Sequence, residues 1–294
     1  MENKITAKDV AKEAGVSVAT VSYVLNGRTD QKISPETQKK IIQIANLMNY
    51  VPSHAAKSLA TGRNNAIGIS YSLSSFESRN SEIMKFVNLM IERFNRMKYD
   101  VTFIPSKAFK EGLPVNRNID AIVAIDLTQD DFRVLSDSYL VPVICVDMIV
   151  NDSLFYQIYE DVPFLIEKAL IELPAGKKTY FIYDSVENAY FEQFILNLPG
   201  DIFPIRQREL SPALFEKIKE ENIIVLGNYL TLSVLMNVKK DNVCAIISDD
   251  FEKQLPVGTK YVFSNIQKKA NITMNIVMNT INRNFDLEHD HKIR

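Results

Sequence analysis

Two short helices joined by a glycine turn are predicted by residues 9–27, which read DVAKEAGVSVATVSYVLNG. Thr6 followed three residues later by Asp9 resembles a capping box, so we expect the first helix to begin there. Gly15 can adopt the positive φ that ends this helix, and Ser17 can cap the second one. Apolar residues recur at helical spacing in both segments, which predicts that the two helices pack together. These residues are Val10, Ala11 and Ala14 in the first helix, and Val21, Val24 and Leu25 in the second.

A third helix is predicted after a polar loop. Ser34 is a cap, Pro35 suits the first helical position, and Glu36 lies near the positive end of the helix. The apolar residues from Ile41 to Met48 extend this helix to Asn49. Two short helices across a glycine turn, packed by a third, form a helix-turn-helix unit, which is typical of proteins that read duplex DNA.

Two segments of the chain resemble a known family. The stretch 9–27 is similar nearly throughout to the DNA-binding signature of the LacI family, and NYVPSHAAKSLATGR, residues 49–63, resembles the hinge of the same family. The resemblance implies a helix-turn-helix domain over residues 1–50, a hinge helix and linker over 51–64, and a two-lobed effector-binding and dimerisation module over 65–294. It also implies a homodimer bound to a palindromic operator in double-stranded DNA.

The resemblance assigns base contacts to the second helix. If the docking is similar, the side chains directed toward the major groove are those of Ser17, Val18, Ala19, Ser22 and Tyr23. Tyr23 stands where many relatives carry arginine, and loss of a bidentate guanine donor should change the preferred half-site. The alternative, that Tyr23 packs against the sugar-phosphate backbone, stays open.

Further DNA contacts are implied for the head and the hinge. Hydroxyl, amide and guanidinium donors that can hold phosphates are those of Thr6, Thr20, Asn26 and Arg28. The hinge residues implied to lie against the groove or a phosphate are His54, Ala55, Ala56 and Lys57. Leu59 matches the family leucine that wedges between bases in the minor groove. The alternative for Leu59 is an apolar contact with the body.

The rest of the chain predicts an α/β body with parallel sheets. Short apolar strands are expected in two sets, with amphipathic stretches such as 82–97 between them. The strands are 67–71, 101–104, 121–125 and 143–146, and then 179–183, 202–205, 223–226, 243–247 and 261–263. Strands alternating with helices indicate two wound lobes, and the resemblance implies a periplasmic-binding-protein-like module with a ligand cleft between them.

The ligand residues of the family are poorly matched. Relatives carry an arginine, a glycine and an aromatic residue after the first strand of the second lobe, whereas residues 183–194 read YDSVENAYFEQF and lack both arginine and glycine. The later asparagine-aspartate pair is replaced by asparagine-tyrosine at 228–229, and the glycine expected after Ile247 is missing. Candidate effector contacts are Asn228, Asp249 and Asp250, with Phe76 and Arg79 in the loop after the first strand of the body. Solvated loops or helix caps are the alternative for all five.

Composition narrows the remaining possibilities. Residues 1–64 carry nine Lys and Arg against five Asp and Glu, a net charge of +4, and the remainder carries 25 against 31, a net charge of −6. A basic head on an acidic body fits a segment that binds a polyanion. Cys145 and Cys244 each lie in an apolar run, so we expect buried reduced thiols and a cytoplasmic protein without a membrane span. His289 and His291 lie in EHDHKIR, which we expect to be a disordered tail rather than a metal site.

Two functions remain open at this point. The first is a dimeric repressor controlled by a small cytosolic effector, a sugar or sugar phosphate by analogy with the family. The second is a DNA-binding regulator whose body senses no small molecule and acts through dimerisation or a protein partner. We expect no cofactor and no enzymatic activity, because no nucleophile, acid-base pair or metal motif is present in the sequence.

Overall fold

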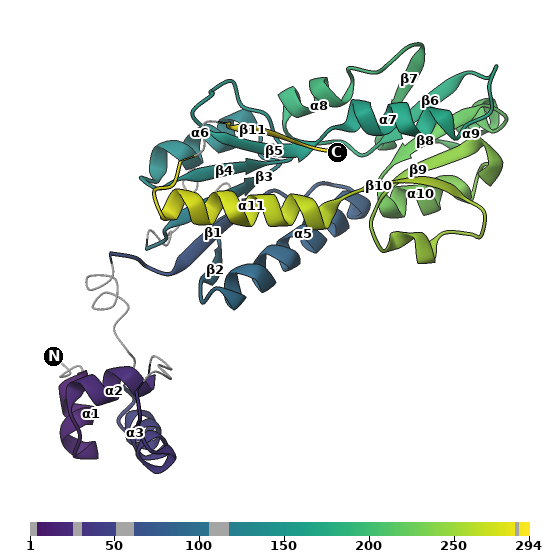
Figure 1. Cartoon of the computed structure of the whole chain (residues 1–294). Helices are drawn as coiled ribbons and strands as arrows, with labels where there is room; N and C mark the ends of the chain where they lie inside the picture. The colour runs from purple at the N-terminus through teal and green to yellow at the C-terminus, as the bar shows by residue number, and fades with distance from the viewer. Residues whose placement is uncertain (1–4, 26–30, 51–61, 106–117, 286–287) are drawn as a thin grey trace. The chain divides into compact units, whose positions relative to one another are not determined.

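The computed structural model describes residues 5–25, 31–50, 62–105, 118–285 and 288–294. The chain divides into two compact units, residues 1–64 and 65–294, which we call the head and the body (Figure 1). The hinge segment 51–61 lies outside the described residues.

The head contains the three predicted helices, α1 (Ala7–Ala14), α2 (Val18–Leu25) and α3 (Pro35–Leu47). The predicted caps are confirmed: the backbone N–H of Thr6 donates to Asp9 at 2.8 Å, and Ser34 accepts the N–H of Thr37 at 3.2 Å. Gly15 has a φ of 70° and ends α1. The buried side chains form one small core from all three helices: Val10, Ala11, Ala14, Val21, Ile41 and Ala45.

The first lobe of the body is a six-stranded parallel sheet in the order β11-β5-β4-β3-β1-β2. Its strands are β1 (Ala66–Tyr71), β2 (Asp100–Phe103), β3 (Ala121–Ile125), β4 (Val143–Val146), β5 (Tyr156–Glu160) and β11 (Asp290–Ile293). Helices α5 (Glu77–Arg96) and α11 (Ile266–Ile281) cover one face, and α6 (Gln129–Ser138) covers the other (Figure 1). Alternate residues of β3 serve the two faces: Val123 packs under α5 and α11, and Ile122 and Ala124 pack under α6.

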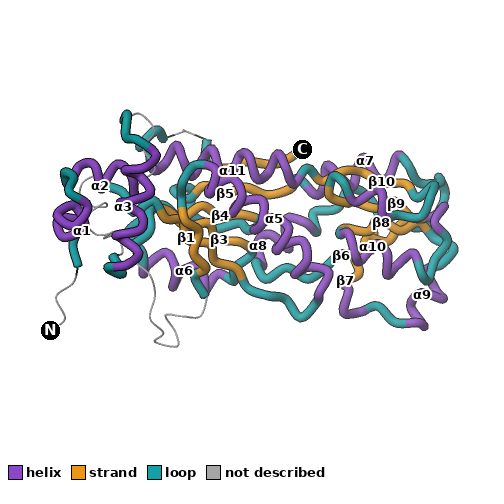
Figure 2. The backbone as a smooth tube through the Cα atoms, turned by 90° about the horizontal axis from the view of Figure 1, so that it is seen from below, coloured by secondary structure: helices purple, strands orange, loops and turns teal. Residues whose placement is uncertain are grey.

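The second lobe is a five-stranded parallel sheet in the order β10-β9-β8-β6-β7. Its strands are β6 (Thr179–Tyr183), β7 (Ile202–Arg206), β8 (Asn222–Leu226), β9 (Val243–Ser248) and β10 (Lys260–Ser264). Helices α7 (Val162–Ile171) and α8 (Ala189–Ile195) pack on one face, and α9 (Pro212–Ile218) and α10 (Asn228–Leu235) on the other. Figure 2 shows the strands in these two groups. The chain enters the second lobe after β5 and returns after β10, so the predicted two-lobed α/β architecture is confirmed.

Two expectations about the helices and strands of the body are wrong. The segment containing Phe76 and Arg79 is not a loop throughout, because α5 begins at Glu77 and places Arg79 in its first turn, five residues before the predicted start. Strand β5 was not predicted, because YQIYE lacks the apolar run of its neighbours although all five residues are buried. Tyr156 and Ile158 are buried in the core under α5 and α11, whereas Tyr159 packs against Phe191 and Phe194, and a local pattern does not reveal these distant contacts.

The C-terminal tail is also ordered, contrary to expectation. Strand β11 pairs in parallel with β5, where the N–H of Gln157 donates to the carbonyl of His289 at 2.7 Å. Ile293 is fully buried in the core under α5 and α11. The backbone hydrogen bonds and this single apolar anchor outweigh the polar composition of the segment.

Both cysteines are buried and unpaired, as expected. Burial raises the pKa of the Cys244 thiol to about 12, so the sulfur is held as the thiol. Among the described residues, no helix is both long enough and apolar enough to cross a membrane.

Candidate functional site

Helix α2 presents an exposed face on the head. Val21 is buried against α1 and α3, whereas Val18, Ala19 and Ser22 are exposed and Tyr23 is half-buried. Val18 keeps 42% of its surface exposed. An exposed row on the second helix of such a unit is where base contacts are made in helix-turn-helix proteins.

Several predicted DNA-contacting hydroxyls already have partners within the head. The hydroxyl of Thr6 donates to Asp9 at 2.7 Å, and this bond is the first of those that lower the pKa of Asp9. The Ser17 hydroxyl accepts the backbone N–H of Thr20 at 3.1 Å and lies 2.8 Å from the Thr20 hydroxyl. Each hydroxyl retains acceptor capacity, so a second bond to DNA remains compatible with these caps.

The other predicted DNA contacts lie outside the described residues. These are Asn26 and Arg28 after α2, and His54, Ala55, Ala56, Lys57 and Leu59 in the hinge segment.

In the body, polar side chains gather where the strands of the two lobes end. Asp126 and Asp147 directly follow β3 and β4, and Asp184 directly follows β6. Asp126 and Asp147 have φ of 47° and 48°, a left-handed conformation that aspartate adopts more readily than most residues. In parallel α/β sheets the crevice at the carboxyl ends of the strands is the usual ligand site, so this crevice is the candidate site of the body.

Two buried ion pairs occupy the first-lobe side of the crevice. Arg79 donates from Nε and Nη2 to Oδ2 of Asp126, at 3.2 and 2.9 Å. Lys269 donates to both oxygens of Asp147, at 3.0 and 2.8 Å, and lies 3.6 Å from Glu160. Burial alone would lower the pKa of Lys269, but Asp147 and Glu160 raise it by more, so the ammonium stays charged.

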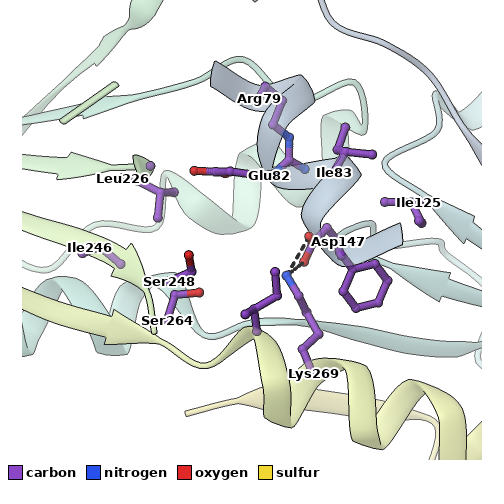
Figure 3. A pocket seen from close by; sticks show the side chains of 13 residues that line it. Arg79, Glu82, Ile83, Ile125, Asp147, Leu226, Ile246, Ser248, Ser264 and Lys269 are labelled. Carbon is purple, nitrogen blue, oxygen red and sulfur yellow. Dashed lines mark hydrogen bonds and ion pairs between the residues drawn. The ribbon is translucent and has the colours of Figure 1, made fainter. Parts of the chain in front are cut away.

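A cavity of about 50 Å³ lies between the lobes. Figure 3 shows Arg79, Glu82, Asp147 and Lys269 on its first-lobe side, and Leu226, Ile246 and Ser248 on its second-lobe side. One water accounts for roughly 30 Å³ of liquid, and sites for small organic ligands are typically about 300–1,000 Å³. In this conformation the cavity is therefore smaller than a typical site for a small organic ligand.

The predicted effector residues have different positions around this cavity. Arg79 lines the cavity. Asn228 does not line it, but donates from its amide nitrogen to the hydroxyl of the lining residue Ser248 at 2.8 Å. Asp250 pairs with Lys85 of α5. Phe76 is the residue before α5, and neither it nor Asp249 is among the lining residues.

Sequence reasoning missed the most buried charges of the crevice. Asp126 and Asp147 could have been found, because each directly follows a strongly apolar strand, in AIVAID and VICVD. Glu82 and Lys269 carry no such signal, because a charged residue on an amphipathic helix ordinarily belongs to the solvated face.

Asp184, on the second-lobe side of the crevice, is a buried carboxyl group with a raised pKa. Its Oδ1 accepts the hydroxyl proton of Ser78 at 3.0 Å, and its Oδ2 is buried without a hydrogen-bond partner among the described residues. Burial, followed by repulsion from Glu82, raises the pKa of Asp184 to about 7, against the smaller opposing effects of Ser78 and Arg79. This carboxyl therefore takes up a proton near neutral pH.

The raised pKa predicts a pH-dependent effect of Asp184→Asn. Between the ordinary pKa and about 7, folded Asp184 holds a proton that the unfolded chain has released, so stability falls as pH rises, by about 1.4 kcal/mol per unit. Asparagine keeps the acceptor for Ser78 but never ionises. At pH 8 we expect the free energy of unfolding of the variant to exceed that of the native protein by roughly 1–3 kcal/mol, with a higher melting temperature. The difference should disappear toward pH 4.

Thermal unfolding of both proteins across this pH range measures the effect. Asp201→Asn, which removes an exposed carboxyl from the same lobe, is the control and should give no such trend. If the difference in melting temperature between Asp184→Asn and the native protein were the same at every pH, Asp184 would be ionised throughout the range.

The head resembles known proteins in sequence. The family model described as "Bacterial regulatory proteins, lacI family" matches residues 6–53. The chain is 29% identical over 162 residues to the fructose operon regulatory protein of Vibrio cholerae, covering 51% of this chain and 48% of that protein. It is 43% identical over 67 residues to the sucrose operon repressor of Klebsiella pneumoniae, covering 22% of this chain and 20% of the repressor. The matches thus span about half the length of the first relative and a fifth of the second.

Solved structures resemble the whole chain in fold. The Lac repressor bound to ONPG in the repressed state has a TM-score of 0.69 at 13% identity, covering 99% of this chain and 97% of the repressor. A periplasmic binding protein/LacI transcriptional regulator from Alkaliphilus metalliredigens has a TM-score of 0.57 at 16% identity, covering 78% of this chain and 95% of that one. A helix-turn-helix head followed by a periplasmic-binding-protein-like body defines the class. Within that class, residues 6–53 match the lacI family model, and the chain is similar to regulators of that family in sequence over the head and in fold over the whole chain.

Proposed function

We propose that this protein is a transcription regulator that binds a palindromic operator as a homodimer and acts as a repressor in the cytoplasm. The exposed face of α2, in a head that matches the lacI family over residues 6–53, is the observation that carries the proposal. A two-fold dimer presents two reading helices in mirrored sense and therefore requires two half-sites. The relatives named above are regulators, and one solved neighbour is described as a Lac repressor dimer bound to operator.

Selection from randomised duplex DNA, followed by footprinting, tests this function. We expect an inverted repeat protected on both halves, and an affinity that falls steeply with salt because basic residues release counterions from the phosphates. Protection of a single asymmetric half-site by a monomer, or an affinity insensitive to salt, would contradict the proposal.

The role of Tyr23 gives a sharper test of how α2 is docked. Tyr23→Arg places a bidentate donor on the exposed side of α2, and a good arginine-guanine pair is worth roughly 1–3 kcal/mol against the wrong base. We therefore expect the variant to prefer a different half-site in the same selection. Gln43→Arg adds an equal charge to an exposed position of α3 and should strengthen binding to all sequences alike. An unchanged preference in Tyr23→Arg would place Tyr23 against the sugar-phosphate backbone.

Control of this regulator by a small effector remains a separate proposal. By analogy with the family the ligand would be a sugar or sugar phosphate held between the lobes, and Arg79 is the predicted effector residue that lines the cavity there. The alternative is a body that senses no small molecule and acts through dimerisation or a protein partner. The small volume of the crevice and the pairing of Arg79 with Asp126 favour the alternative.

A further inference from the structure

Side chains of the first lobe bind the second lobe directly across the crevice. Oδ1 of Asp126 accepts two backbone N–H groups of the second lobe, those of Glu187 at 2.9 Å and Asn188 at 3.1 Å. Its other oxygen binds Arg79, so this one carboxylate is paired on both sides. Backbone N–H groups at the start of a helix have no partner within the helix, and here the protein itself supplies the acceptor.

The Asn188 side chain adds two further bonds to the first lobe, one as donor and one as acceptor. Its amide nitrogen donates to the carbonyl of Leu127 at 3.1 Å, and its amide oxygen accepts the N–H of Ile149 at 3.0 Å, both in the first lobe. The same oxygen caps α8 by accepting the N–H of Phe191 at 2.9 Å. Because Asn188 is fully buried, losing the first-lobe partners would leave polar groups unpaired unless water replaced them.

A second contact of this kind joins α5 to α10. Oε1 of Glu82 accepts the backbone N–H of Asn228, the first residue of α10, at 2.9 Å. Gly227 has a φ of 127°, and a Cβ at this position would lie 3.0 Å from the same Glu82 oxygen, so glycine permits the approach. One turn along α5, Lys85 donates to the Ser248 hydroxyl at 3.0 Å and pairs with Asp250.

We propose that the two lobes close on each other without a small-molecule ligand, because first-lobe carboxylates accept backbone N–H groups of the second lobe directly. The remaining cavity of about 50 Å³ is what these contacts leave between the lobes. A free ligand would have to displace Asp126 or Glu82, which are attached to the same chain and present at high effective concentration. The body is therefore closed in its ligand-free state. The consequence that operator binding needs no effector rests on the proposed function, but closure itself does not.

The test uses the full chain with one spin label in each lobe. Labels at Arg133→Cys on α6 and Lys217→Cys on α9 occupy exposed positions, and the two native cysteines are buried. The doubly labelled chain is diluted into an excess of unlabelled chain, so that the distance within one chain dominates. We expect a single narrow distance distribution in the ligand-free protein, unchanged by glucose or fructose 1-phosphate at millimolar concentration. A broad distribution that narrows when either compound is added would overturn the proposal.

A charge-balanced double variant tests the contacts themselves. Glu82→Leu with Lys85→Met removes the α5 contacts with α10, Ser248 and Asp250 but leaves the buried pair of Arg79 and Asp126 intact. We expect a longer and broader distance and a melting temperature lower by about 5 °C. The matched control is Glu92→Leu with Arg96→Met, which removes a surface ion pair from the same helix and should keep the narrow distance.

The outcomes separate closure from DNA binding. A double variant that retains the narrow distance would overturn the part of the proposal that assigns closure to Glu82 and Lys85, and would leave the bonds of Asp126 and Asn188 as those that hold the lobes together. Operator affinity measured with and without the two compounds gives an independent readout. A ten-fold change would show that closure does not make the body independent of an effector. Failure to bind any DNA would contradict the proposed function while leaving the distance measurement interpretable.

Discussion

Replacing Lys269 by methionine is expected to lower the free energy of unfolding of the body by about 3–5 kcal/mol. Lys269 is the buried partner of both Asp147 and Glu160, at 2.8 and 3.6 Å. Methionine has a similar length but no charge, so the variant leaves two carboxyl groups buried beside each other without their cation. Removing one member of a buried ion pair costs far more than removing a surface pair, because the other charges remain desolvated.

The loss should depend on pH in a defined direction. Burial raises the pKa of Glu160 to about 7 even with Lys269 present, so without the ammonium this carboxyl is protonated still more readily. A carboxyl group whose pKa is raised in the folded state lowers the stability of the protein as pH rises. The destabilisation by Lys269→Met should therefore be larger at pH 8 than at pH 5. Chemical denaturation at the two pH values measures it.

Two further variants make this prediction specific. Lys268→Met removes an exposed lysine from the adjacent position of α11 and should change stability little. Lys269→Met combined with Asp147→Asn removes one of the uncompensated charges, and asparagine tolerates the left-handed backbone at position 147. We expect this double variant to regain part of the loss. Equal stability of Lys269→Met and the native protein would show that the ion cluster is hydrated rather than buried.

Replacing Leu59 by alanine is expected to produce the largest change in operator binding. Leu59 lies outside the described residues, so this prediction rests on the resemblance of residues 49–63 to the family hinge. Unstacking a base step costs a few kcal/mol, and without an apolar wedge nothing recovers that energy. We therefore expect the specific affinity to fall by roughly 100-fold, together with a smaller bend in the DNA.

Non-specific binding provides the internal control for Leu59→Ala. It depends on phosphate charge, which the substitution does not alter, so it should change little. Gel phasing measures the bend, and thermal melting without DNA tests whether the leucine instead stabilises the body. A variant that bends DNA normally but melts earlier would assign Leu59 to a contact with the body and leave the wedge unsupported.

The head is the part of this protein that the sequence alone determined. Its helices begin and end at residues whose effects are local: Thr6 with Asp9, Gly15 and Ser34 act on backbone groups within a few residues. The apolar spacing along 9–27 then identifies the buried face, and by exclusion the exposed face of α2. Such signals survive without knowledge of any partner, because the atoms that interact are close in the chain.

The strands of the body were predictable for the same reason, with instructive exceptions. The strongly apolar runs such as AIVAI and VICV need no partner to be recognised as buried strands. In contrast, YQIYE in β5 and DHKI in β11 are polar enough to resemble loops. β5 becomes a strand because it pairs with β4 on one side and β11 on the other, and β11 becomes one because it pairs with β5 and buries Ile293.

Only the tertiary structure decided what the crevice of the body contains. Asp126 meets Arg79 from 47 residues away and Asn188 from 62 residues away, and Lys269 meets Asp147 from 122 residues away. Helical spacing from Ile266 puts Lys269 on the buried face of α11 and leaves Lys268 outside it, but only the fold brings carboxylates opposite that buried lysine. The sequence could show that the family's ligand residues are replaced. Whether the replacements leave the site open or closed depends on the distances between first-lobe and second-lobe side chains. Only the folded structure sets these distances.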